Sequence, residues 1–179
     1  MKSETRRVTE GAVLIALALA LSYVERLFPL GLLIPLPGVK LGLANIVTVL
    51  TLYSLGPGTA FTVLILRCLL GSFFGGGITG LAFSMTGGLL AMLVMFAASH
   101  LRILSIFGVS ILGAAFHNVG QVMAAVVMMK SAAVLAYLPP LLLVGLCTGF
   151  LTGAITSASL GALDKNGLLA KIKKGRQLL

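Results

Sequence analysis

The side chains able to take part in binding chemistry are few in this chain of 179 residues, and several of them stand within long apolar runs. The stretch "GAAFHNVGQV" places His117 and Gln121 four residues apart, with Asn118 beside His117. Positions four apart share a helix face, so three hydrogen-bonding groups gather within about one turn. Such groups either bind a ligand inside a helix bundle or only join neighbouring helices by hydrogen bonds. The sequence leaves both interpretations open.

Basic residues extend this candidate site. Arg67 lies within an apolar run that contains no acidic residue, and Lys40 and Asn45 belong to the stretch "LIPLPGVKLGLANIV". If Arg67, Lys40 and His117 line one pocket that opens to the outside, their positive charge favours an anionic ligand. The alternative is that Arg67 extends to the membrane interface and binds nothing. The predicted substrate-binding residues are therefore Lys40, Asn45, Arg67, His117, Asn118 and Gln121.

The residues that catalysis requires do not come together in the sequence. The four acidic residues, two histidines and two cysteines form no paired carboxylates, no nucleophile with a base and no spacing of metal ligands. We therefore expect no enzymatic activity, no cofactor and no metal site. Cys68 and Cys147 each lie within an apolar run, where a free cysteine behaves as a small hydrophobic residue, and we expect no disulfide between them.

The composition is that of an integral membrane protein, with 59% hydrophobic and 9% charged residues and a mean hydropathy of +1.13. Glycine, proline or charged residues separate six apolar runs, which predict an all-α bundle of six transmembrane helices. The second and third runs are shorter than the roughly 20 residues that a perpendicular span needs, so residues 41–72 could instead form one broken hairpin. The predicted spans are 11–28, 41–55, 57–72, 79–98, 105–129 and 135–161.

Basic residues outnumber acidic ones by 13 to 4, and most of them lie near the two ends of the chain. Because basic residues favour the cytoplasmic side, this bias predicts an even number of spans with both ends in the cytoplasm. We expect one membrane domain, with a cytoplasmic N-terminus at 1–10, the six-helix bundle at 11–161 and a basic cytoplasmic tail at 162–179. This orientation explains the net charge of +9 without a nucleic-acid partner.

The first predicted helix contains "AVLIALALA", which places Ala12, Ala16 and Ala20 at steps of four. Small residues at this spacing let another helix approach closely. The neighbour could be a helix of the same bundle or a helix of a partner protein. Glu25 and Arg26, at the other end of this helix, are most simply interpreted as anchors at the membrane interface.

Two connections on the outer side differ in character. The first contains Pro35, Pro37 and Gly38, which end a helix and permit a turn, so it is predicted to be either an ordered cap over the bundle or an ordinary proline-containing loop. The second is "GSFFGGGITG", from Gly71 to Gly80, in which three consecutive glycines predict a loop that serves as a gate or as a flexible linker.

Two of these stretches carry a resemblance to a known family. The stretches "PGVKLGLANIVTVL" and "GAAFHNVGQV" closely resemble small membrane proteins catalogued both as heptaprenyl diphosphate synthase component I and as the Gx transporter family. The resemblance covers roughly residues 8–162. This family in turn resembles the substrate-binding S components of energy-coupling factor (ECF) transporters, which are six-helix bundles with both ends in the cytoplasm.

The resemblance to S components implies roles for residues already named. Ala12, Ala16 and Ala20 would dock on a coupling transmembrane subunit that is driven by two ATPase subunits, and the segment from Leu33 to Lys40 would cover the ligand. The implied function is capture of a small solute from outside for ATP-driven uptake. The resemblance does not identify the residues that touch the solute.

The other family name implies an alternative function. The chain would be a noncatalytic membrane subunit, component I, that associates with heptaprenyl diphosphate synthase in menaquinone side-chain biosynthesis. Prenyl elongation requires magnesium on aspartate-rich motifs, and this chain has one aspartate, Asp164. It therefore cannot be the catalytic subunit. A third interpretation is a self-associating scaffold in which the polar residues only pack the bundle.

Overall fold

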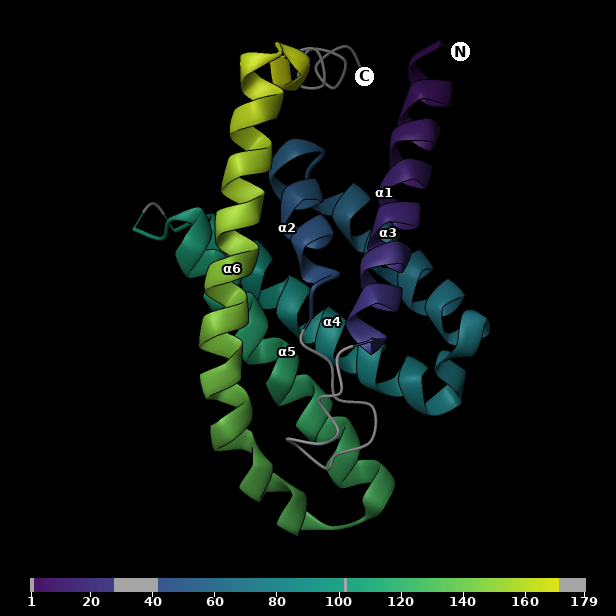
Figure 1. Cartoon of the computed structure of the whole chain (residues 1–179), viewed down its shortest axis with the longest axis vertical. Coiled ribbons are helices and arrows are strands. Elements are labelled where there is room, and N and C mark those ends of the chain that lie inside the picture. Colours follow the sequence, from purple (N-terminus) through teal and green to yellow (C-terminus); the bar gives the residue numbers. More distant parts are fainter. Residues whose placement is uncertain (1, 28–41, 102, 171–179) are drawn as a thin grey trace.

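The computed structural model describes residues 2–27, 42–101 and 103–170, and this part of the chain contains six α-helices and no strand (Figure 1). A π-helical turn, η2 (Ser72–Gly76), follows α3, and a 3₁₀ helix, η3 (Ala132–Tyr137), precedes α6. The all-α fold and the six predicted helical runs are confirmed. The helices are α1 (Lys2–Arg26), α2 (Asn45–Ser54), α3 (Pro57–Gly71), α4 (Gly77–Ser99), α5 (Ile106–Met129) and α6 (Leu138–Lys165).

Several helices are long and apolar enough to cross a membrane. Among the described residues, four segments qualify by length and composition, at Val8–Glu25, Pro57–Ser99, Ile106–Met129 and Ala132–Lys165. The third and fourth predicted spans lie within one of these segments, with a bend at η2 between them. The chain therefore has the helices of a membrane protein, as the composition predicts.

The second helix, α2, has only 10 residues, which is too short to cross a bilayer upright. It lies in the middle of the molecule, between α1 and α6 (Figure 1). Eight of its residues are buried, including Val47, Val49 and Thr51. A helix enclosed by its neighbours in this way does not need the length of a helix that faces lipid.

The glycine-rich stretch from Gly71 to Gly80 is more ordered than the predicted loop. The backbone leaves helical geometry at Phe74, Gly75 and Gly77. Gly75 and Gly77 have φ angles of +111° and +60°, which side-chain-bearing residues rarely adopt. The glycines therefore produce a sharp bend between α3 and α4 and not a long flexible connection.

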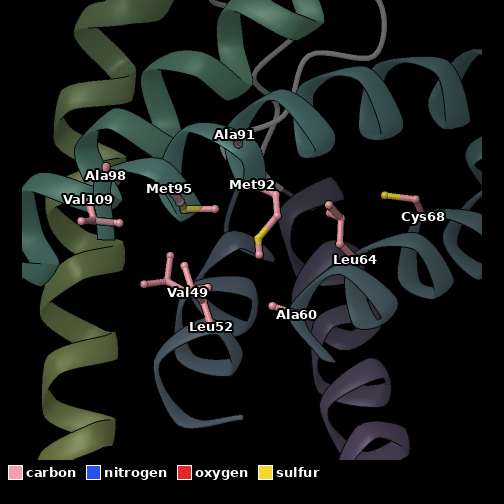
Figure 2. Packing of buried hydrophobic residues seen from close by; sticks show 10 residues of the cluster. All are labelled: Val49, Leu52, Ala60, Leu64, Cys68, Ala91, Met92, Met95, Ala98 and Val109. Carbon is pink, nitrogen blue, oxygen red and sulfur yellow. The ribbon is translucent and has the colours of Figure 1, made fainter. Parts of the chain in front are cut away.

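A core of aliphatic and methionine side chains joins α2, α3, α4 and α5 (Figure 2). Met92 and Met95 of α4 are buried in it, facing Val49 of α2 and Leu64 of α3. The most extensive helix contacts are those of α5 with α4 and with α6. Burial of these side chains holds the centre of the bundle together.

Glycines allow α5 to touch both of its neighbours. A Cβ atom added at Gly120 of α5 would stand 2.7 Å from the Cα atom of Gly87 in α4. A Cβ atom added at Gly149 of α6 would stand 2.6 Å from the Cα atom of Ile111 in α5. The helices therefore meet backbone to backbone, as small residues permit in membrane proteins.

The first helix, α1, lies at the edge of the bundle. Ala18 is fully buried against Val47 of α2 and Val63 of α3. Ala12, Ala16 and Ala20 are exposed, so this stripe does not pack inside the bundle. Its assignment as a docking surface for a partner remains a prediction.

Replacing Gly120 by alanine tests the contact between α4 and α5. The added methyl group meets backbone atoms of Thr86 and Gly87, which cannot move aside as a flexible side chain can. We expect the free energy of unfolding in detergent to fall by at least about 1 kcal/mol. Gly58→Ala is the control, because a Cβ atom there meets no described atom within 4 Å. Equal stability of the two variants would contradict the close crossing.

Candidate ligand-binding site

Five polar side chains from four helices are buried in the middle of the bundle, and we call them the polar cluster. Each is at most 7% exposed. They come from the end of α1, the start of α2, the second half of α3 and the middle of α5, and they meet beside two glycines of α4. The members of the polar cluster are Glu25, Asn45, Arg67, His117 and Gln121.

Arg67 points into the bundle. Its guanidinium Nη2 donates a hydrogen bond of 3.3 Å to Oδ1 of Asn45. Nη2 also lies 3.7 Å from the position that a Cβ atom would occupy at Gly88 of α4. The alternative that Arg67 extends to the membrane interface is therefore wrong, and a positive charge lies buried where α2, α3 and α4 meet.

Glu25 belongs to this site, which the sequence analysis did not recognise. Its side chain is 3% exposed and its Oε1 accepts a hydrogen bond from the backbone N–H of Gly42. The interpretation of Glu25 as an interfacial anchor is therefore wrong, while the side chain of Arg26 lies outside the described residues. The sequence does contain an indication that Glu25 belongs to the site, because Glu25 is the only acidic residue between Glu10 and Asp164. A buried arginine without an acidic residue in its own helix requires polar partners from another segment.

His117 and Gln121 of α5 close the other side of the polar cluster. A Cβ atom added at Gly87 would lie 3.1 Å from Cε1 of His117 and 3.0 Å from Cγ of Gln121. A Cβ atom added at Gly42 would lie 3.0 Å from Nδ2 of Asn45 and 3.7 Å from Cδ2 of His117. Gly42 also has a φ of +83°. His117 therefore lies between Asn45 and Gln121, in space that the two glycines leave free.

Asn118 has a different environment from His117 and Gln121. Its Nδ2 donates a 2.6 Å hydrogen bond to the carbonyl oxygen of Leu141 in α6. Nδ2 would stand 2.8 Å from a Cβ atom added at Gly145. Asn118 thus joins α5 to α6, which is the packing role that the sequence left open for all three residues.

The structure brings together four of the six predicted substrate-binding residues, Asn45, Arg67, His117 and Gln121. Asn118 lies apart from them, on the face of α5 that meets α6. Lys40, with the rest of the predicted covering segment from Leu33, lies outside the described residues.

Several buried atoms of the polar cluster lack a hydrogen-bond partner within the described part of the chain. They are Nδ2 of Asn45, Nε of Arg67, and both Nε2 and Oε1 of Gln121. Leaving such a group unsatisfied costs about 1–3 kcal/mol. Three of these four atoms are donors, so the chemical group that complements them best is rich in acceptor oxygens and negatively charged.

A metal site needs several His, Cys, Asp or Glu side chains close together. Within residues 2–27, 42–101 and 103–170, no three His, Cys, Asp or Glu residues gather closely enough to hold a metal ion. Cys68 is buried and Cys147 is exposed, and both are free thiols.

The fold and the site define a class of protein, namely an apolar helical bundle with a buried, donor-rich polar cluster. The family model for heptaprenyl diphosphate synthase component I matches residues 14–159, and the chain belongs to this family. The match contains the whole polar cluster, together with Ala16 and Ala20 of the exposed stripe. No curated protein and no solved structure matches the chain. The family suspected from the sequence is thus confirmed.

Removing the side-chain amide is expected to raise the stability of the folded protein at Gln121 and to lower it at Asn118. Gln121→Met keeps the volume but removes two unsatisfied buried atoms, so the protein without ligand should become about 1–3 kcal/mol more stable. Asn118→Leu leaves the carbonyl of Leu141 without its partner and should destabilise by a similar amount. Thermal unfolding of both variants in the same detergent measures the difference. A loss of stability in both would show that Gln121 is a structural residue.

Proposed function

We propose that this chain is a noncatalytic membrane subunit that binds a small ligand through an anionic, oxygen-rich group at the polar cluster. The observation that carries the proposal is the set of buried, unpartnered donors of Asn45, Arg67 and Gln121. An apolar bundle gains no stability from groups of this kind, whereas a ligand oxygen would satisfy them. The guanidinium group of Arg67 donates most strongly to a charged oxygen, whereas the carboxylate of Glu25 in the same cluster is engaged by the backbone N–H of Gly42.

Membership of the component I family supports a role beside a separate heptaprenyl diphosphate synthase, in the synthesis of a menaquinone side chain. The diphosphate of a prenyl substrate or product is an anionic, oxygen-rich group that suits the polar cluster. The single aspartate, Asp164, is exposed near the end of α6 and lies far along the chain from the polar cluster. Prenyl transfer would therefore take place on the partner enzyme, while this chain binds the diphosphate in the membrane.

A second candidate is an S component of an energy-coupling factor transporter, and the exposed face of α1 favours it. Ala12, Ala16 and Ala20 form a surface that no described helix covers. Such a surface would fit a coupling transmembrane subunit driven by two ATPase subunits. The solute would then enter from outside, beneath the segment from Leu33 to Lys40. The family match supports the first candidate more than the second.

Both candidates place the protein in the bacterial cell membrane with its two ends in the cytoplasm. The start of α1 and the end of α6 lie at the same end of the molecule (Figure 1). Lys165 lies in the last turn of α6, and further basic residues follow it in the sequence. Positive charge at this end supports a cytoplasmic orientation.

Binding of inorganic pyrophosphate tests the polar cluster directly. We expect pyrophosphate to raise the unfolding temperature of the purified protein, because a ligand that binds only the folded state stabilises it. Gln121→Met should weaken this effect at least about tenfold in apparent affinity, since a lost hydrogen bond to a charged group costs about 1.5–3 kcal/mol. Asn118→Leu is the control and should keep its affinity. An unchanged response in Gln121→Met would place the anion elsewhere.

Co-purification from native membranes distinguishes the two partner assignments. The tagged protein is isolated in mild detergent beside Ala16→Trp, and the co-purifying proteins are identified by mass spectrometry. Leu17→Trp is the matched control, because Leu17 is also exposed but points about 100° away around the helix. A tryptophan that overpacks a contact surface lowers the free energy of binding by about 1–3 kcal/mol, which reduces the amount of bound partner roughly tenfold.

Each outcome of this experiment decides between the candidates. A prenyl diphosphate synthase recovered equally with all three forms supports component I. ATPase subunits with a membrane partner that are lost only from Ala16→Trp support the S component. Recovery of neither set of partners contradicts both assignments and favours a self-associating scaffold.

A further inference from the structure

Arg67 has a second environment, to which Asn45 does not contribute. It lines a narrow notch together with three serines, Ser22, Ser72 and Ser84, and with glycines at the end of α3 and the start of α4. The notch has a volume of about 10 Å³. This is the space of one water molecule or one oxygen atom. The Nε atom of Arg67 is buried and has no hydrogen-bond partner among the described residues.

The walls of the notch favour negative charge. The 23-residue helix α4 begins at Gly77, and Gly76 and Gly80 line the notch, so the positive end of the helix dipole lies beside it. The negative end of α3 is also near, but its last carbonyls are engaged. The backbone N–H of Ser72 bonds to the carbonyls of Cys68 and Leu69. The guanidinium and the start of α4 are therefore the two features of the notch that favour an anion.

An apolar crevice continues from the notch. It has a volume of about 400 Å³ and is lined mainly by Leu19, Ala20, Tyr23 and Val24 of α1 and by Phe74 of η2. Ser22 and Gly71 line both the crevice and the notch, so the two spaces adjoin. The volume of the crevice falls within the range of small-molecule sites.

We propose that the notch and the crevice together bind a single-chain amphiphile with an oxyanion head group. One head-group oxygen fills the notch beside the guanidinium group of Arg67 and the start of α4, while the apolar chain lies between α1 and η2. This site is separate from the proposed ligand site at the polar cluster, although Arg67 borders both. A soluble anion would occupy the notch alone and leave the crevice unused.

A second apolar groove provides an internal comparison. It lies between α4 and α5, has a volume of about 480 Å³ and is lined by residues such as Thr86, Leu93 and Met123. Its described lining contains no charged side chain. Any alkyl chain in this groove should therefore bind without preference for the charge of its head group.

Binding of dodecyl phosphate tests the proposal. The purified protein in a neutral maltoside detergent is titrated with dodecyl phosphate, dodecyl glucoside or inorganic phosphate, and bound molecules are counted by native mass spectrometry. We expect dodecyl phosphate to bind at least about tenfold more tightly than the other two, because it alone fills both spaces. Equal binding of the glucoside would mean that the notch holds only water, and equal binding of inorganic phosphate would mean a soluble anion. Either result overturns the proposal.

Variants locate the bound amphiphile. Ser22→Leu fills the junction of the notch and the crevice and should weaken dodecyl phosphate at least about tenfold. Phe74→Ala removes an exposed wall of the crevice without disturbing the core, and should weaken the binding of dodecyl phosphate severalfold. This variant tests the site even if Ser22→Leu fails to fold. Thr86→Leu, in the groove between α4 and α5, should change nothing. Equal effects of Phe74→Ala and Thr86→Leu would show unspecific binding and overturn the proposal.

The two ligand sites can fail independently. Gln121→Met should weaken the binding of pyrophosphate and leave the binding of dodecyl phosphate unchanged, because Gln121 does not line the notch or the crevice. Phe74→Ala should do the reverse. Loss of both ligands in both variants would overturn the separate amphiphile site while leaving anion binding at the polar cluster intact.

Discussion

The burial of the Arg67 guanidinium inside an apolar bundle is the constraint on which the rest of the structure depends. A buried charge is tolerated only where polar groups surround it. Asn45 supplies one hydrogen bond, and the glycines at 42, 87 and 88 leave space for the side chains around it. The short helix α2 is enclosed by its neighbours because its first residue, Asn45, must reach this charge. The proposed binding at the site rests on what the arginine still lacks within the described part of the chain, which is a partner for Nε.

The sequence predicted the helices well, because long apolar runs bounded by glycine, proline or charge have few alternatives to a helix. It also predicted which residue types meet in the bundle. It could not tell the role of Asn118 from that of Gln121, since adjacent faces of one helix become distinct only when their neighbours are known. Glu25 was missed for a related reason. The end of a helix beside a basic residue has the pattern of an interface anchor, and only the hydrogen bond from the backbone N–H of Gly42 shows that the carboxylate turns inward.

The stretch from Gly71 to Gly80 shows another limit of sequence interpretation. Consecutive glycines are equally compatible with a loose loop and with a helix that bends sharply, because both need φ angles that other residues avoid. Here the bend places the start of α4 beside Arg67. Composition predicts that the backbone can turn at this point, whereas the position of the turn relative to a charge on α3 depends on the packing of the two helices.

The contact between Gly87 and Gly120 has a mechanical consequence. Two helices whose backbones touch cannot slide or separate without losing the whole interface, and α6 is joined to α5 in the same way through Gly149. We therefore expect these three helices to move together. The first helix is held by a much smaller cluster around Ala18. Amide hydrogens of α1 should thus exchange with solvent long before those of α5. Local opening of the bundle should therefore begin with separation of α1 from α2 and α3.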